Sequence, residues 1–286
     1  PGNFFSVQGN VLSAGTSTAG GIVATSTLES KGTLIAATTT RLSGVDYQWP
    51  TSGGSLNQLL STNGSNLLSW RTATEIDEIQ ATSTVFSTAG TFTWIRPAAT
   101  TTKVEVIVVG GGGGGGGVTT SVGNKGAGGG GAGGYAYAVM AVSGNVTVTV
   151  GAGGAGVSGD AGAAGGNSSF AGNFTVTADG GGGAGVDDTS NSPSSGASGG
   201  ATTNAQLGIT GGGGRDGNVN ASYNQSGEGG SGPLGSGGKP QTANGAGVVG
   251  IGCGAGGSGA VGTDTTARAG GNGSAGCVIV RWIDFN

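Results

Sequence analysis

Apolar residues alternate with polar ones along several short stretches of the chain, and this period of two predicts β-strands. The stretches that show it, or that are rich in β-branched and aromatic residues, are 86–95, 104–109, 135–142, 145–150 and 277–283. Successive side chains of a strand point to opposite faces, so each stretch is expected to bury one face. Trp94 and Trp282 lie within these patterns, and we expect both to pack in a core.

The first 71 residues carry shorter apolar patches, and one pair of these patches is marked as a hairpin. Asn63-Gly64 stands between two apolar runs, and both residue types tolerate the positive φ of a tight turn. The side chains expected to supply the apolar contacts of this hairpin are Leu59, Leu60, Leu67 and Trp70. Because such patches give an isolated monomer little core, packing shared among several chains is favoured over a partly disordered arm.

Glycine content changes sharply along the chain. Of the 71 Gly among 286 residues, only eleven lie in residues 1–100. The Gly-rich segments are 110–117, 126–134, 151–159, 180–185, 211–214, 227–238, 245–259 and 270–276. We place the domain boundary before the predicted strand at 86–95, which precedes the first glycine segment at 110–117. This gives an N-terminal region of residues 1–85 and a glycine-rich domain of residues 86–286.

Composition alone permits two interpretations of these segments, a flexible linker or packed glycine helices. A glycine segment buries almost no side chain, so it is ordered only if nearly every backbone N–H and C=O finds a partner. Polyproline II geometry has no internal hydrogen bonds and directs its amides sideways to neighbouring helices. Because predicted strands bracket the glycine region at both ends, packed polyglycine II-type helices are favoured over a linker, with layers of short β-turns as the alternative packing.

The expected fold is therefore mostly β with little helix. A fibrous β region is followed by a glycine-rich domain of short strands and packed polyglycine II-type segments. The one helical candidate is a single turn at residues 74–80, where Ile76 and Ile79 could share a face.

Two sets of motifs carry a resemblance to known proteins. Tyr47-Gln48-Trp49-Pro50, the run from Gln58 to Ser65 and Leu68-Ser69-Trp70 resemble a short repeat of phage tail-fibre proteins. In that family the repeat forms an intertwined homotrimeric shaft, so the resemblance implies a trimer for this region. The motifs around 92–97, 104–112, 133–136, 146–154, 166–170 and 270–282 are similar to a glycine-rich domain of phage tail fibres. In related distal adhesins, glycine-rich helices form a sandwich whose intervening loops touch the host receptor.

Charge and residue usage exclude several function classes. The chain is only 8% charged and carries a net charge of −4, which argues against nucleic acid as a partner. It contains no His, and therefore lacks the commonest general base and metal ligand. No apolar run reaches the roughly 20 residues needed to span a bilayer. We therefore expect no catalytic residues, no metal, no cofactor and no membrane insertion.

The chain contains two cysteines, Cys253 and Cys277. Two are too few for a disulfide framework. We favour two small buried thiols, since free Cys is usually buried. A bridge would require the two segments to pack side by side.

Receptor binding is expected from loop segments that carry aromatic, arginine and amide side chains, since these residue types supply much of the contact at interfaces. The candidates are Arg215, Asp216, Asn218, Tyr223, Asn224 and Gln225, followed by Asp187 and Asp188. A solvated loop without partners is the alternative for each cluster.

These expectations lead to a non-enzymatic structural component of a phage tail fibre, assembled in the host cytoplasm and located in the virion. Its expected partners are further copies of itself in a homotrimer, other tail proteins at the N-terminal side, and a host surface glycan or outer-membrane protein. The alternatives are a purely structural fibre spacer, and an extracellular adhesin or ice-binding protein built on polyglycine II helices.

Overall fold

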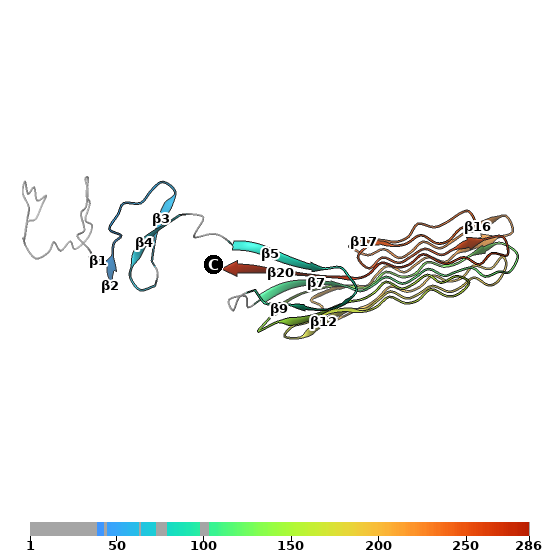
Figure 1. The fold of residues 1–286 in the computed structure, drawn as a ribbon, viewed down its shortest axis with the longest axis horizontal. Helices are drawn as coiled ribbons and strands as arrows, with labels where there is room; N and C mark the ends of the chain where they lie inside the picture. The colour runs from blue at the N-terminus through green and yellow to red at the C-terminus, as the bar shows by residue number, and fades with distance from the viewer. Residues whose placement is uncertain (1–38, 43–44, 63, 73–78, 98–102, 286) are drawn as a thin grey trace, which may run out of the picture. The chain divides into compact units, whose positions relative to one another are not determined.

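The structure is a computed structural model that describes residues 39–42, 45–62, 64–72, 79–97 and 103–285 (Figure 1). The chain divides into two compact units, Pro1–Asp77 and Glu78–Asn286. The second unit thus begins ahead of residue 86, because strand β5 (Ile79–Phe86) belongs to one of its sheets. Of the expected helical turn at 74–80, residues 74–78 lie outside the described residues, and Ile79 and Gln80 begin β5. The described residues contain no helix.

The described part of the first unit consists of two antiparallel hairpins. Their strands are β1 (Thr39–Leu42) with β2 (Val45–Gln48), and β3 (Gln58–Thr62) with β4 (Leu68–Thr72). Gly64 has a φ of 83° between β3 and β4, as expected for this turn. The expectation for the leucines was partly wrong, since Leu59 and Leu67 are 55% and 43% exposed. Trp70 is anchored instead by its indole N–H, which donates to the carbonyl of Ser52 at 2.8 Å.

The second unit begins as a sandwich of two five-stranded antiparallel sheets. One sheet is ordered β13 (Thr202–Thr203), β12 (Thr175–Ala178), β11 (Ser168–Ala171), β10 (Val146–Val150) and β6 (Gly90–Trp94). The other is ordered β14 (Leu207–Ile209), β9 (Tyr135–Ala141), β7 (Lys103–Val109), β20 (Cys277–Phe285) and β5. The strands expected from the period-two pattern are confirmed. Trp94 and Trp282 pack edge to face in the core between the sheets, with centroids 5.5 Å apart.

Beyond the sandwich, the glycine-rich segments run side by side in a bundle, which we call the glycine bundle (Figure 1). By their hydrogen bonds the segments of the described residues are 110–117, 126–134, 151–157, 160–166, 179–187, 194–201, 211–217, 226–232, 237–241, 245–250, 254–261 and 268–276. Two of them, 160–166 and 194–201, are absent from our expected set of Gly-rich segments. Two of the expected segments, 227–238 and 245–259, are each interrupted by a turn with a short strand, β17 (Gly235–Ser236) or β18 (Ile251–Gly252).

Backbone hydrogen bonds in the bundle repeat every three residues. Along segment 110–117, the amides of Gly110, Gly113 and Gly116 donate to segment 126–134. The amides of the next residue in each case, beginning with Gly111, donate to segment 160–166. The amides of the residue after that, beginning with Gly112, donate to segment 268–276. A period of three without internal hydrogen bonds is the geometry of a polyglycine II-type helix. The prediction that the glycine segments form packed polyglycine II-type helices, and not a flexible linker, is therefore confirmed.

Segment 110–117 lies at the centre of six neighbours. It donates to 126–134, 160–166 and 268–276, and its carbonyls accept from 151–157, 179–187 and 254–261. Every N–H from Gly110 to Val118 has a backbone partner at 2.8–3.0 Å. Segments 126–134 and 254–261 are surrounded in the same way, so three central segments are enclosed by a ring of the others. The interior of the bundle is thus made of paired amides and contains few side chains.

Glycine is required inside because neighbouring backbones almost touch. A Cβ placed on Gly115 would lie 1.9 Å from the carbonyl oxygen of Ser258, in the parallel neighbour. The corresponding Cβ on Gly113 would meet the carbonyl of Gly182 at the same distance. On the ring the requirement is relaxed at outward positions, where Ser195 and Ser198 are exposed.

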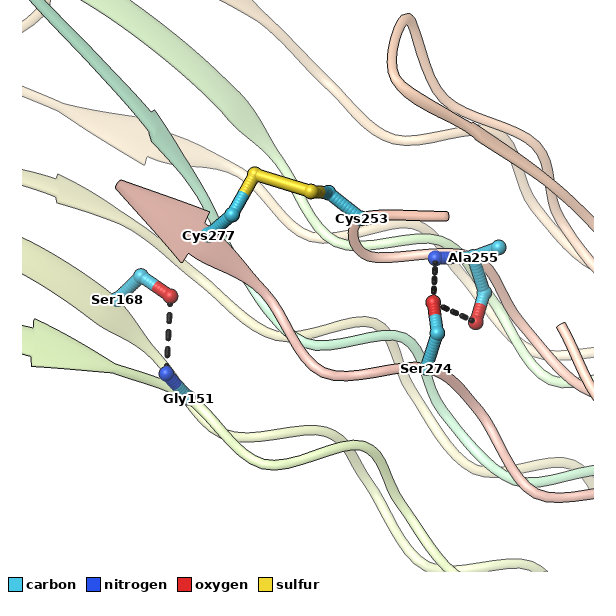
Figure 2. The surroundings of a disulfide bond; sticks show 6 residues. All are labelled: Gly151, Ser168, Cys253, Ala255, Ser274 and Cys277. Carbon is cyan, nitrogen blue, oxygen red and sulfur yellow. Dashed lines mark hydrogen bonds between the residues drawn. A yellow bond between two sulfur atoms is a disulfide. The ribbon is translucent and has the colours of Figure 1, made fainter. Parts of the chain in front are cut away.

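A disulfide between Cys253 and Cys277 joins the bundle to the sandwich (Figure 2). Our expectation of two free thiols was wrong. Cys253 precedes segment 254–261 and Cys277 begins β20, and their Cα atoms lie 5.7 Å apart because the two segments pack side by side. Buried serines add side-chain partners at the same level, for example Ser168 Oγ, which accepts from the amide of Gly151 at 2.9 Å.

Candidate binding surface at the loop end of the glycine bundle

Six connections between glycine segments gather at the end of the bundle that carries β16 (Tyr223–Gln225), remote from the sandwich (Figure 1). They are 118–125, 157–160, 187–194, 217–226, 241–245 and 262–268, and we call them together the loop end. Short pairings tie neighbouring loops together. Val118 bridges both Asp187 and Arg268, and β8 (Lys125–Gly126) pairs with β19 (Val261–Gly262). The loops are therefore held as one surface by the segments below them.

Lys125 is fully buried beneath this surface. Its ammonium donates to the carbonyls of Thr119 at 2.6 Å, of Asp264 at 3.1 Å and of Ser121. Burial lowers the pKa of Lys125, while the nearby carboxylates of Asp187 and Asp264 oppose that shift. The ammonium thus joins loop 118–125 to loop 262–268 from the inside, and it is not available to a ligand.

Asp187 is also part of this interior. It is only 2% exposed, and its Oδ2 accepts from the amide of Gly126 at 2.7 Å while Oδ1 accepts from Thr189 at 3.2 Å. Burial raises the pKa of Asp187, and these two hydrogen bonds oppose the shift. Of the two acidic candidates, Asp188 is therefore the one that faces solvent.

A second charged pair orders loop 262–268. The two terminal nitrogens of Arg268, Nη1 and Nη2, donate to the carboxylate of Asp264 at 2.8 Å, and Nη1 also donates to the carbonyl of Thr266 at 3.0 Å. The hydrogen bond from Arg268, supported by the amide of Thr266, holds the pKa of Asp264 well below its usual range. This bidentate geometry fixes the loop as a rigid turn.

The main cluster of candidate residues lies on the hairpin of β15 (Asn218–Asn220) and β16. Asn218 and Tyr223 are exposed, Tyr223 by 43%, whereas Asn224 and Gln225 are half-buried. Val219 is buried beneath the hairpin. The side chain of Asn124 in the neighbouring loop donates to the carbonyl of Asn220 at 2.7 Å. The hairpin is thus fixed to the rest of the loop end.

The remaining candidates flank this hairpin at the end of segment 211–217. The Arg215 side chain is 80% exposed, and its Nε lies 3.6 Å from the carboxylate of Glu228. The Asp216 carboxylate accepts from the amide of Gly196 at 2.7 Å, so it stabilises the adjacent segment 194–201. The fold thus brings the two groups of candidate residues, 215–225 and 187–188, together at or beside the loop end. Asp187 and Asp216 stabilise the backbone there through hydrogen bonds from Gly126 and Gly196.

Loops 118–125 and 262–268 also contribute to this surface, although we did not select them from the sequence. Val122 is 72% exposed, and Thr265 and Thr266 are solvent-facing. The exposed chemistry of the loop end is mainly hydroxyl and amide, with Tyr223, Val122 and few charges. Within the described residues, no group of three or more His, Cys, Asp or Glu side chains could hold a metal ion. The same described residues contain no helix that is long and apolar enough to cross a membrane.

Comparison with known proteins identifies the second unit. The model of a family described as a glycine-rich domain matches residues 86–283, so the chain belongs to that family. The matched range extends through the sandwich and the glycine bundle, including every loop of the loop end. No curated protein matches the chain.

Proposed function

We propose that this chain is a structural and adhesive component of a phage tail fibre, without catalytic activity, and that the loop end carries its receptor contacts. The observation that carries the proposal is the arrangement of the second unit. A rigid bundle places six loops, drawn from positions far apart in the sequence, on one surface remote from the sandwich. Binding residues are commonly found on loops that a rigid scaffold positions.

The loop end suits recognition without much rearrangement. Its base is fixed by Lys125, Asp187 and the Asp264–Arg268 pair, so little conformational entropy is lost when a ligand orders the exposed side chains. Tyr223 offers a large apolar ring with a polar tip, and the surrounding amides and hydroxyls offer donors and acceptors. A host surface glycan or an outer-membrane protein presents the complementary groups.

Multivalency is the second element of the proposal. We propose that the N-terminal region forms a homotrimer joined to other tail proteins, which makes three loop ends available at once. Leu56, Leu59 and Leu67 support this, because all are exposed in the single chain and would be covered by shared packing. Three tethered weak contacts bind far more tightly than one, since the second and third contacts form at high effective concentration.

Binding to bacterial cells tests this proposal. Fluorescently labelled full chain is incubated with a panel of bacterial strains, and bound fluorescence is measured by flow cytometry. On any strain that binds the wild type, Asp188→Ala combined with Tyr223→Ala is expected to lower binding at least tenfold. Thr147→Ala, on the outer face of the sandwich, is the matched control and is expected to bind normally.

The result also separates the alternatives. Unchanged binding by the double variant would place recognition elsewhere and refute the role of the loop end. Absence of wild-type binding across the panel would favour a structural spacer. Thermal hysteresis in a freezing-point assay would instead favour ice binding by the outer faces of the glycine bundle.

A further inference from the structure

The two outer faces of the sandwich differ in chemistry. On the sheet that contains β10, the outward residues are Thr91, Thr93, Thr147, Thr149, Ser169, Ala171, Thr175, Thr177 and Thr203. All but one of them carry a hydroxyl group, as expected for the solvated face of an antiparallel sheet. The outward face of the opposite sheet is largely apolar, although it belongs to the same sandwich.

An apolar row crosses all five strands of that opposite sheet. In cross-strand register the row is Leu207, Tyr137, Ile107, Ile279 and Val85. Its ends, on the edge strands β14 and β5, are the most open, with Leu207 53% and Val85 57% exposed. A second row of Ile209, Tyr135, Val109 and Cys277 runs beside it. Val109 and Cys277 are already buried within the chain, so only Ile209 and Tyr135 open this row to solvent. We call the two rows the apolar face.

The apolar face has defined limits. On one side the next row holds Glu105 and Arg281, which lie 3.8 Å apart, and Glu105 also bonds the Tyr137 hydroxyl. On the other side the disulfide holds Cys253 against Cys277 (Figure 2), and Ile251, two residues before Cys253, is 70% exposed. The apolar face therefore has a charged border on one side, and the exposed side chain of Ile251 continues it on the other.

The size of the patch indicates what covers it. Strands at about 4.8 Å spacing give two such rows an area of roughly 300 Å². Because Ile107, Val109 and Cys277 are buried, the open part of the patch is roughly 200 Å². A stable complex between free proteins buries about 800 Å² on each partner, so this patch alone is too small to capture a free partner. It is large enough for a partner already held nearby, because a tether supplies an effective concentration on the order of millimolar.

We infer that the apolar face packs against the same face of further copies of this chain, so that the sandwiches of one fibre are joined at their sheets. The inference rests on the proposed trimer, which supplies the tether. Each copy brings an identical apolar face, and the hydroxyl-rich faces of the sandwiches stay outside in water. The contact fixes the spacing between the loop ends of neighbouring copies.

Site-specific photo-crosslinking of the full chain tests this inference. A benzophenone amino acid replaces Leu207 on the apolar face or, as the matched control, Thr177 on the hydroxyl-rich face. Illumination is expected to link copies through position 207, at residues near Val85, Ile279 or Ile251, and not through position 177. Adding Val85→Lys is expected to lower the yield of the 207 crosslink at least fivefold, whereas Thr147→Lys leaves it unchanged.

The mass of the native assembly, measured on the same samples, separates this inference from the proposed function. A trimer without crosslinks from position 207 overturns the inference and leaves the proposed trimer standing. Equal crosslinking from both positions also overturns it, because contact is then unspecific. A monomer without crosslinks refutes the inference together with the trimer. Crosslinked dimers without a trimer support the apolar face and refute the trimeric fibre.

Discussion

Replacing Gly115 by alanine tests the central physical claim, that paired amides in close contact stabilise the glycine bundle. The added Cβ would lie 1.9 Å from the carbonyl oxygen of Ser258. Segment 254–261 would therefore have to move by about 1.4 Å to reach the roughly 3.3 Å of a C–H···O contact. That movement breaks the bonds from Gly257 to Gly113 and from Ala260 to Gly116, both 3.0 Å long.

The cost follows from these two bonds. Each broken bond leaves a buried donor and a buried acceptor without a partner, at about 1–3 kcal/mol per group that stays unpaired. Allowing for partial relaxation, Gly115→Ala is expected to lower the free energy of unfolding by about 3–5 kcal/mol. For a unit of this size the midpoint of thermal unfolding should fall by on the order of 10 °C, measured by differential scanning calorimetry.

Gly185→Ala is the matched control, with the same chemical change on the ring of the bundle. The nearest atoms to its added Cβ lie 3.8 Å away, in Ser195, which is ordinary contact. The control should keep the wild-type midpoint or raise it slightly, because alanine restricts the unfolded chain by about 0.4–1 kcal/mol. A wild-type midpoint for Gly115→Ala, or an equal loss in both variants, would refute close packing as the reason for glycine.

Three further changes probe other parts of the second unit. Lys125→Met leaves three loop carbonyls unpaired, so about 3 kcal/mol of stability should be lost, and hydrogen exchange should accelerate in the loops around it but not in the central glycine segment. Replacing Cys253 and Cys277 together by Ser should cost about 3 kcal/mol in denaturant unfolding, because the bridge closes a loop of sequence separation 24. The pKa of Asp264 is depressed by Arg268, so their contact is fully effective above about pH 4 and is lost as pH falls through the lower folded-state pKa. Thermal unfolding between pH 2 and 6 should show a smaller acid loss for Asp264→Asn than for the wild type.

Local sequence patterns were sufficient for strands β6, β7, β9, β10 and β20 and for the nature of the glycine segments. They missed β11, β12, β13, β14 and most of β5, which complete the two sheets. Alternation around Trp94 and Val148 marks strands directly, and the runs of glycine leave amide pairing as the only source of order. The partner of each amide could not be predicted, because every glycine presents the same group and tertiary packing alone decides which neighbour it meets. Segment 194–201 was missed because its serines and alanines resemble a polar loop, although Ser195 and Ser198 occupy outward positions of the ring.

The sequence indicated where the candidate residues lie, but not which of them are buried. Tyr223 lies in the loop end, as its loop position suggested, and Arg215 lies beside it at the end of segment 211–217. Nothing local distinguishes the buried Asp187 from the exposed Asp188. Lys125 was missed because a lone Lys after a glycine turn is normally solvated, and its burial depends on carbonyls from residues 119, 121 and 264. The disulfide was missed because Cys253 and Cys277 become neighbours only once the bundle is packed.

The uniform run 110–117 does not determine its own register against the neighbouring segments. Sliding it by one residue while rotating it a third of a turn gives an arrangement with the same amide pairs, since all eight positions are glycine. Its alignment must therefore come from the ends, where Val109 is fixed in β7 and Val118 is buried between Asp187 and Arg268. With both ends held about 25 Å apart, a run one glycine longer or shorter would fit only by moving one of those valines out of its place.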